Sequence, residues 1–149
     1  MATYKASTVN GGQVATYYLD VEIESDSTNK RSILTLTTSI ATPLRVAQYW
    51  SYDYIYVDGV NVAKEEYFDL DTTSENPNTK IEIQSVEHKI NHTGKQEVTI
   101  KASFDGPDGG VRGPGDAVIE EKITLPALIT APTLNPINQN TVVQGYTSI

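Results

Sequence analysis

The sequence has no cysteine among its 149 residues, which excludes disulfides, thiolate metal sites and cysteine nucleophiles. It also lacks any apolar run near the ~20 residues that a membrane-spanning helix needs. The opening residues, Met-Ala-Thr-Tyr-Lys, do not show the charged-then-apolar pattern of a signal peptide. We therefore expect a protein that is made and folded in a cytoplasm and does not insert into a membrane.

Basic residues are few: 11 Lys and Arg stand against 19 Asp and Glu, and the net charge is −8. Because proteins bind a phosphate backbone through Lys and Arg, this balance argues against nucleic acid as a partner. The length suits one domain of ordinary size. Such a domain buries enough surface to fold without disulfides.

Methionine occurs once, whereas Thr, Val, Ile and Tyr are frequent, and this composition favours strands over helices. Alternation of apolar and polar residues predicts strands over 14–24, 31–40, 49–57, 60–70, 81–90, 98–104 and 117–125. Residues 1–13 are interpreted as a loose lead-in or a short edge strand. Glu121 interrupts the apolar stripe of the last strand, which indicates a sheet edge or a bulge there.

These strands predict an all-β fold, an antiparallel β-sandwich of immunoglobulin-like or jelly-roll-like type with about seven to eight strands. The sandwich domain is expected over residues 1–127. Residues 128–149 contain Pro132 and Pro136 without apolar periodicity, which predicts an extended linker leading to a further domain.

A row of aromatic residues marks the stretch from Tyr49 to Val62. Trp50, Tyr52, Tyr54 and Tyr56 all fall on even positions. They therefore lie on one face of a strand, with Ile55 and Val57 on the other. Asp58-Gly59 then supplies a tight turn. The row has two interpretations: rings packed against the facing sheet, or a surface that stacks on a ligand such as a sugar.

Residues for catalysis are not recognisable. There is no Gly-x-Ser-x-Gly elbow, and neighbouring acids such as Glu65-Glu66 point to opposite strand faces unless a bulge intervenes. We expect neither an enzyme nor a required cofactor. His88 and His92, four residues apart, are interpreted as surface or turn residues.

Three acidic residues, Asp105, Asp108 and Asp116, lie in or beside a glycine-rich loop. Carboxylates on a flexible loop can bind calcium, although their spacing does not match the EF-hand pattern. The alternative is a solvated loop, because Asp and Gly are common turn residues.

The order of motifs resembles a known family. Met-Ala-Thr precedes a Tyr-x-Leu-x-Val-x-Ile strand, an Ile-x-Val-Asp-Gly hairpin follows, and a turn ending at Gly94 leads into Val-Thr-Ile-Lys-Ala-Ser-Phe. The closing strand ends Ile-Thr-Leu-Pro-Ala-Leu. Over residues 1–130 this is similar to the N-terminal β-domain of minor structural and receptor-binding tail proteins of siphophages that infect Gram-positive bacteria. The chain departs from the family at Ile90-Asn91-His92-Thr93-Gly94, where the family carries His-Asn-x-Asp-Gly, and after the last strand, where the family's Pro-Arg is absent.

The resemblance implies a virion tail component that serves host attachment or tail assembly. Its implied partners are other tail or baseplate proteins and the host cell-wall polysaccharide. Tail fibres are usually trimers, so the resemblance makes a homotrimer a candidate for the oligomeric state of the intact protein. No heptad or repeat in this sequence indicates one. Two alternatives stay open: a free-standing carbohydrate-binding module or lectin, dependent on calcium through Asp105, Asp108 and Asp116, and an immunoglobulin-like spacer without a ligand.

Overall fold

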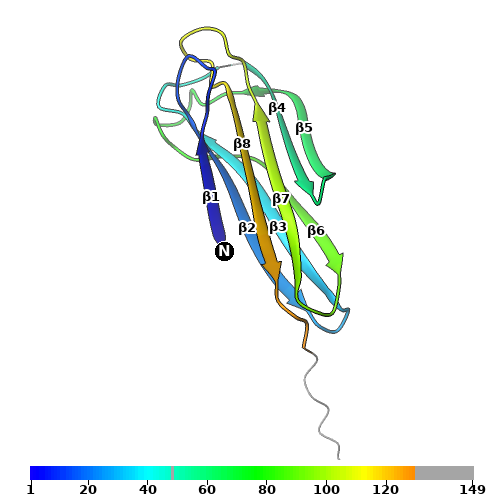
Figure 1. Ribbon diagram of the computed structural model, residues 1–149. Helices are drawn as coiled ribbons and strands as arrows, with labels where there is room; N and C mark the ends of the chain where they lie inside the picture. Colours follow the sequence, from blue (N-terminus) through cyan, green and yellow to red (C-terminus); the bar gives the residue numbers. More distant parts are fainter. Residues whose placement is uncertain (48, 130–149) are drawn as a thin grey trace, which may run out of the picture.

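The computed structural model describes residues 1–47 and 49–129. In these residues eight antiparallel strands form two four-stranded sheets, which pack face to face as an elongated sandwich (Figure 1). The predicted antiparallel β-sandwich is therefore confirmed. The expected linker over 128–149 lies almost wholly outside the described residues, so its conformation is not assigned.

The first sheet has the strand order β1-β2-β3-β6. Its strands are β1 (Ala2–Ser7), β2 (Thr16–Asp26), β3 (Arg31–Ala41) and β6 (Ile81–Asn91). β2 and β3 form the predicted hairpin, paired without interruption from Thr16↔Ala41 to Asp26↔Arg31. Of the two interpretations of the N-terminal residues, the edge strand is correct, because β1 pairs only with β2.

The second sheet has the order β5-β4-β7-β8. Its strands are β4 (Tyr49–Val57), β5 (Val60–Leu70), β7 (Gln96–Asp105) and β8 (Asp116–Leu125). Asp58 and Gly59 both have positive φ, 48° and 80°, as a two-residue hairpin turn between β4 and β5 requires. β8 is an edge strand in unbroken register with β7, so Glu121 marks a sheet edge and not a bulge.

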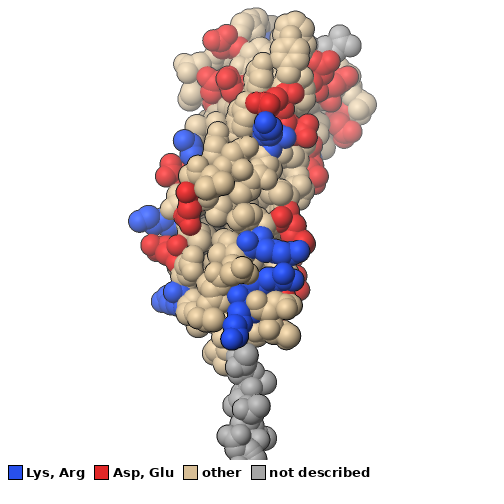
Figure 2. All heavy atoms as spheres, turned by 90° about the vertical axis from the view of Figure 1, so that its right-hand side faces the viewer, with Lys and Arg blue, Asp and Glu red and all other residues tan. Residues whose placement is uncertain are grey.

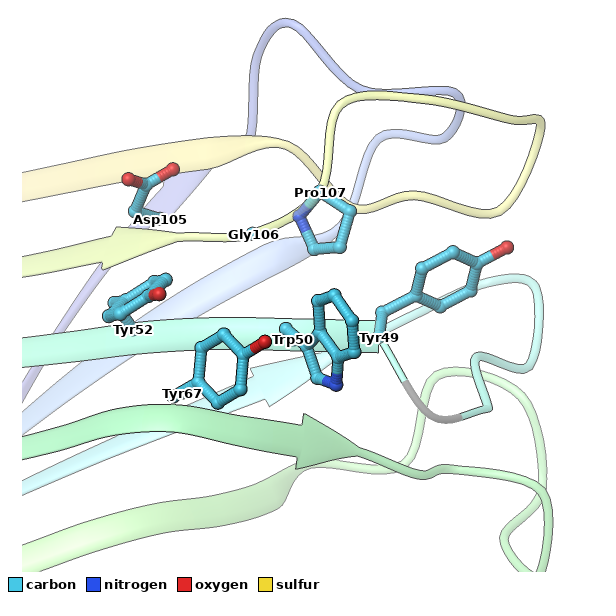
Figure 3. Close-up of a pocket in the computed structure, with 7 residues that line it drawn as sticks. All are labelled: Tyr49, Trp50, Tyr52, Tyr67, Asp105, Gly106 and Pro107. Carbon is cyan, nitrogen blue, oxygen red and sulfur yellow. The ribbon is translucent and has the colours of Figure 1, made fainter.

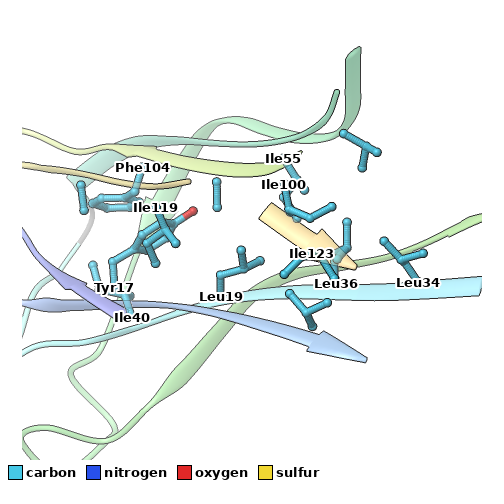
Figure 4. Close-up of a cluster of buried hydrophobic side chains, with 14 of the residues drawn as sticks. Tyr17, Leu19, Leu34, Leu36, Ile40, Ile55, Ile100, Phe104, Ile119 and Ile123 are labelled. Carbon is cyan, nitrogen blue, oxygen red and sulfur yellow. The ribbon is translucent and has the colours of Figure 1, made fainter. Parts of the chain in front are cut away.

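The core lies between the two sheets and is built from the predicted alternation (Figure 4). Tyr17, Leu19 and Val21 of β2 are buried, as are all four predicted inward residues of β7. The latter are Val98, Ile100, Ala102 and Phe104. The Tyr17 ring packs against Phe104 with 5.7 Å between centroids, so the largest core side chains join the two sheets.

The turn between β6 and β7 is held by a histidine. The His92 ring lies 2.7 Å from Ser32 Oγ through Nε2 and 2.8 Å from the Gly94 carbonyl through Nδ1. The Leu128 N–H donates to the Thr93 carbonyl at 2.8 Å. His92 is thus a turn residue, in agreement with the sequence interpretation.

The β7–β8 loop docks on the connection between β1 and β2. Val9 and Asp116 exchange two backbone hydrogen bonds of 2.8 Å, and the Gly12 N–H donates to the Gly113 carbonyl at 2.8 Å. Gln13 is buried and donates its side-chain amide to the Arg112 carbonyl at 2.9 Å. The glycine-rich loop is therefore anchored at its base, and it holds Gly106 and Pro107 in place.

A substitution at Gly115 tests this anchoring. Its φ is +77°, and a Cβ there would lie 2.1 Å from the Val9 carbonyl oxygen. Gly115→Ala should lower the free energy of unfolding by about 1–3 kcal/mol, because it adds both a backbone penalty and a steric clash. Urea denaturation measures the change.

Gly109→Ala, in the same loop, is the matched control. A Cβ at Gly109 meets nothing within 4 Å, so this variant should stay within about 0.5 kcal/mol of wild type. Equal effects of the two substitutions would contradict the docked loop.

Candidate functional site

The aromatic row lies on the outer face of β4. Trp50, Tyr52, Tyr54 and Tyr56 alternate with the buried residues Ser51, Asp53, Ile55 and Val57. Trp50 is 59% exposed, and the three tyrosines are half-buried. The interpretation of the row as core packed against the facing sheet is therefore wrong.

A bulge in β5 adds a fifth ring that the sequence analysis missed. Ser51 pairs with Phe68 and Asp53 with Glu65, so Tyr52 stands opposite two residues, Glu66 and Tyr67. Tyr67 has φ of +57° and is 58% exposed. A positive φ is uncommon for a bulky residue and costs of order 1–3 kcal/mol, so the surrounding structure must hold it. The bulge turns this side chain outward over the sheet.

Tyr67 stacks on Trp50 with 4.9 Å between ring centroids and 21° between planes. It also meets Tyr52 edge-on, with centroids 6.2 Å apart. Offset stacking and edge-to-face packing are the favoured geometries of aromatic pairs. The three rings thus stabilise one another's orientation on an exposed surface.

An open groove of about 490 Å³ lies along these rings (Figure 3). Its described lining consists of Tyr49, Trp50, Tyr52, Tyr67, Asp105, Gly106 and Pro107. The rings come from β4 and β5, whereas Asp105 ends β7 and Gly106 and Pro107 begin the docked β7–β8 loop. The groove is thus apolar along its floor and carries one carboxylate at its side.

The rest of the aromatic row continues beyond this groove. Tyr54 and Tyr56 lie with centroids 6.3 Å apart, and neither lines the groove. The Tyr54 hydroxyl donates to Glu66 Oε2 at 2.8 Å, and this bond raises the pKa of Tyr54 to about 12. Lys101 Nζ lies 5.9 Å from the Tyr56 ring centroid. The four predicted residues therefore share a face, but only Trp50 and Tyr52 belong to the groove.

On the inner face of β4, Asp53 is fully buried and connects the two sheets. It accepts hydrogen bonds from the Tyr17 hydroxyl at 2.5 Å, the Thr38 hydroxyl at 2.6 Å and the Gln84 amide at 2.7 Å. These donors come from β2, β3 and β6, so one residue of the second sheet is bonded to three strands of the first. Burial raises the pKa of Asp53, although the three hydrogen bonds partly oppose this effect.

The three acidic residues of the calcium hypothesis are only partly brought together. Asp105 and Asp116 are directly paired across β7 and β8. Burial of Asp116, followed by the close approach and charge of the Asp105 carboxylate and the charge of Asp108, raises the pKa of Asp116. Residues 1–47 and 49–129 contain no group of three His, Cys, Asp or Glu side chains that could hold a metal ion.

A bulge lies beside the adjacent acids Glu65 and Glu66, and this is the condition under which neighbouring acids on a strand could share one site. They still act in different places. Glu66 bonds to Tyr54 on the outer face, whereas the charge of Glu65 contributes to the raised pKa of the buried Asp53. The bulge therefore creates an aromatic surface and not a pair of catalytic carboxylates.

Comparisons with protein-family models, curated proteins and solved structures find no match to this chain. Within the described ranges, no helix has the length and apolar character to cross a membrane.

Removal of the Asp53 charge tests the buried network through its pH dependence. Because the pKa of Asp53 is raised in the folded state, its contribution to stability is fully present below the ordinary value of 3.8. The contribution is lost as the pH rises through the folded-state pKa. The stability of wild type relative to Asp53→Asn should therefore be greatest in acid and decrease toward neutral pH.

Urea unfolding of both proteins from pH 3 to pH 8 measures this difference. Subtraction of the two curves removes the acid dependence of other carboxylates, such as Asp71, whose pKa is lowered by its bonds to Thr73. Parallel stability curves would show that Asp53 is not buried between the sheets.

Proposed function

We propose that this chain is a non-catalytic carbohydrate-binding domain that acts in host attachment as part of a phage tail. The exposed Trp50 ring, held by Tyr67 at the floor of an open groove, is the observation that carries the proposal. A flat apolar ring suits the C–H face of a sugar, and amphipathic aromatic side chains supply contact area at low entropic cost.

The polar groups around the rings suit a saccharide as well. Asp105 can accept hydrogen bonds from sugar hydroxyls, while the hydroxyls of Tyr52 and Tyr67 can donate or accept. A few polar groups at the side of an apolar concave surface are typical of small-molecule sites. The rings stand on paired strands, which position a site more rigidly than free loops do.

The phage setting rests on the resemblance of residues 1–130 to siphophage tail proteins. The acidic composition and the lack of a recognisable catalytic constellation in the sequence agree with it. In this setting, cell-wall polysaccharide of a Gram-positive host is the ligand, and other tail or baseplate proteins are the structural partners. The domain acts in the virion after synthesis in the host cytoplasm.

The other functions have less support. Burial of all four aromatics of the row would favour a spacer without a ligand, but Trp50 is mostly exposed. A calcium-dependent lectin needs a cluster of oxygen ligands, and the described part of the chain brings no three acidic side chains together for one.

A cell-wall binding assay tests the proposal. Purified walls from a panel of Gram-positive bacteria should bind the wild-type domain. Trp50→Ala should lower the affinity for these walls about tenfold or more. Loss of a central aromatic contact typically costs about 2 kcal/mol of binding energy.

Tyr18→Ala is the matched control, because Tyr18 is a half-buried ring on the other sheet, where Lys80 covers it at 4.7 Å. It should bind as wild type does. Thermal melting should show that Trp50→Ala is folded. Equal retention of wild type and folded Trp50→Ala, or no retention on any wall, would contradict the proposed function.

A further inference from the structure

The one charged residue in the described lining of the groove is acidic, and so is a residue that faces Trp50. Asp105 lines it from β7, and Asp69, which is exposed, stands directly opposite Trp50 on β5. None of the described lining residues is Lys or Arg. On the face shown in Figure 2, most of the acidic side chains lie toward the upper end and most of the basic ones toward the lower end. An anionic ligand in this groove would therefore meet repulsion, whereas a cation would be attracted.

Asp105 is available to a ligand. Its side chain is exposed, and in the described part of the chain no Lys, Arg or His nitrogen lies within 4.0 Å of its carboxylate. Its neighbour across the sheet is a second acid, Asp116, one oxygen of which is buried without a hydrogen-bond partner. Like charges opposite each other in a sheet are destabilising, so a cation at Asp105 would relieve an existing repulsion.

Aromatic rings and a carboxylate side by side can recognise an organic ammonium group. A cation over the face of Trp or Tyr is attracted by the ring quadrupole. A charged N–H donor forms a stronger hydrogen bond with a carboxylate than with a neutral acceptor. Both partners are present here within one groove, since Trp50, Tyr52 and Tyr67 lie beside Asp105.

We infer that the groove binds a saccharide that carries a free, positively charged amino group, with the ammonium at Asp105 and the sugar ring against Trp50. This inference rests on the proposed function and adds the chemical class of the ligand. A neutral sugar would leave Asp105 without a charged partner, and a phosphate- or carboxylate-bearing glycan would face Asp105 and Asp69.

A matched pair of oligosaccharides tests the inference. The chain has a single tryptophan, and that residue is Trp50, so its fluorescence reports directly on the groove. Oligomers of β-1,4-linked glucosamine should change this fluorescence on titration. The same oligomers with every amine acetylated should bind at least about tenfold more weakly, because a hydrogen bond to a charged group contributes about 1.5–3 kcal/mol.

Asp105→Asn should reduce the affinity for the amine oligomer about tenfold or more, and it should weaken the dependence on salt, since a charge pair is screened by ions. Asp108→Asn is the matched control: it removes the same charge from the loop that follows Asp105, but Asp108 does not line the groove. It should bind the amine oligomer nearly as wild type does. Choline serves as an ammonium without a sugar and should bind much more weakly.

Several results would overturn the inference. They are equal binding of the amine and acetylated oligomers, no effect of Asp105→Asn, or choline binding as tight as that of the amine oligomer. If either oligomer binds and Trp50→Ala removes the binding, the proposed carbohydrate function still holds. If neither oligomer binds, the inference fails, and cell-wall retention by wild type against Trp50→Ala decides the proposed function separately.

Discussion

The hydrogen bonds of one buried carboxylate determine which face of β4 is turned outward. Asp53 accepts from Tyr17, Thr38 and Gln84 on three strands of the opposite sheet. A shift of a strand by one residue would move every side chain to the other face. Such a shift would leave these buried donors without an acceptor, which costs about 1–3 kcal/mol for each group. The outward position of Trp50 therefore depends on the inward position of Asp53.

Two further features build a groove from that outward row. The bulge in β5 brings Tyr67 over Trp50, and the docked β7–β8 loop brings Pro107 to the other side. Each depends on backbone that ordinary residues rarely adopt, φ of +57° at Tyr67 and +77° at Gly115. Strained backbone is often found at binding sites, where the rest of the fold keeps it in place. The groove is thus a product of the fold and not of one strand alone.

Much of the fold could be predicted from the sequence because period-two alternation survives in most strands. Tyr17, Leu19 and Val21, for example, follow it without exception. Strand order could not be predicted, since alternation does not say which strands pair. The sequence does not decide which face of β4 points outward. Its inner residues are Ser51, Asp53, Ile55 and Val57, and they are no more apolar than Trp50, Tyr52, Tyr54 and Tyr56. The hydrogen-bond donors to Asp53 fix which face of β4 is turned inward, and these donors come from other strands of the chain.

The candidate site shows the same limit. Trp50 and Tyr52 were predicted as candidates, but nothing in the sequence around Glu66 and Tyr67 identifies a bulge, because neither is a residue that favours positive φ. Asp105 was predicted for calcium. The structure instead places it beside aromatic rings, and no three-acid cluster forms in the described part of the chain. A residue's neighbours across strands, which the sequence does not display, change the chemistry it can perform.

Quenching of the single tryptophan by acrylamide tests the outward aromatic row most directly. Acrylamide is neutral, so the acidic surface does not repel it. If Trp50 lies on the outer face, its quenching constant in the native protein should approach that of the urea-unfolded chain. Strong protection of Trp50 in the native protein, with a blue-shifted emission, would place the ring in the core and contradict the account.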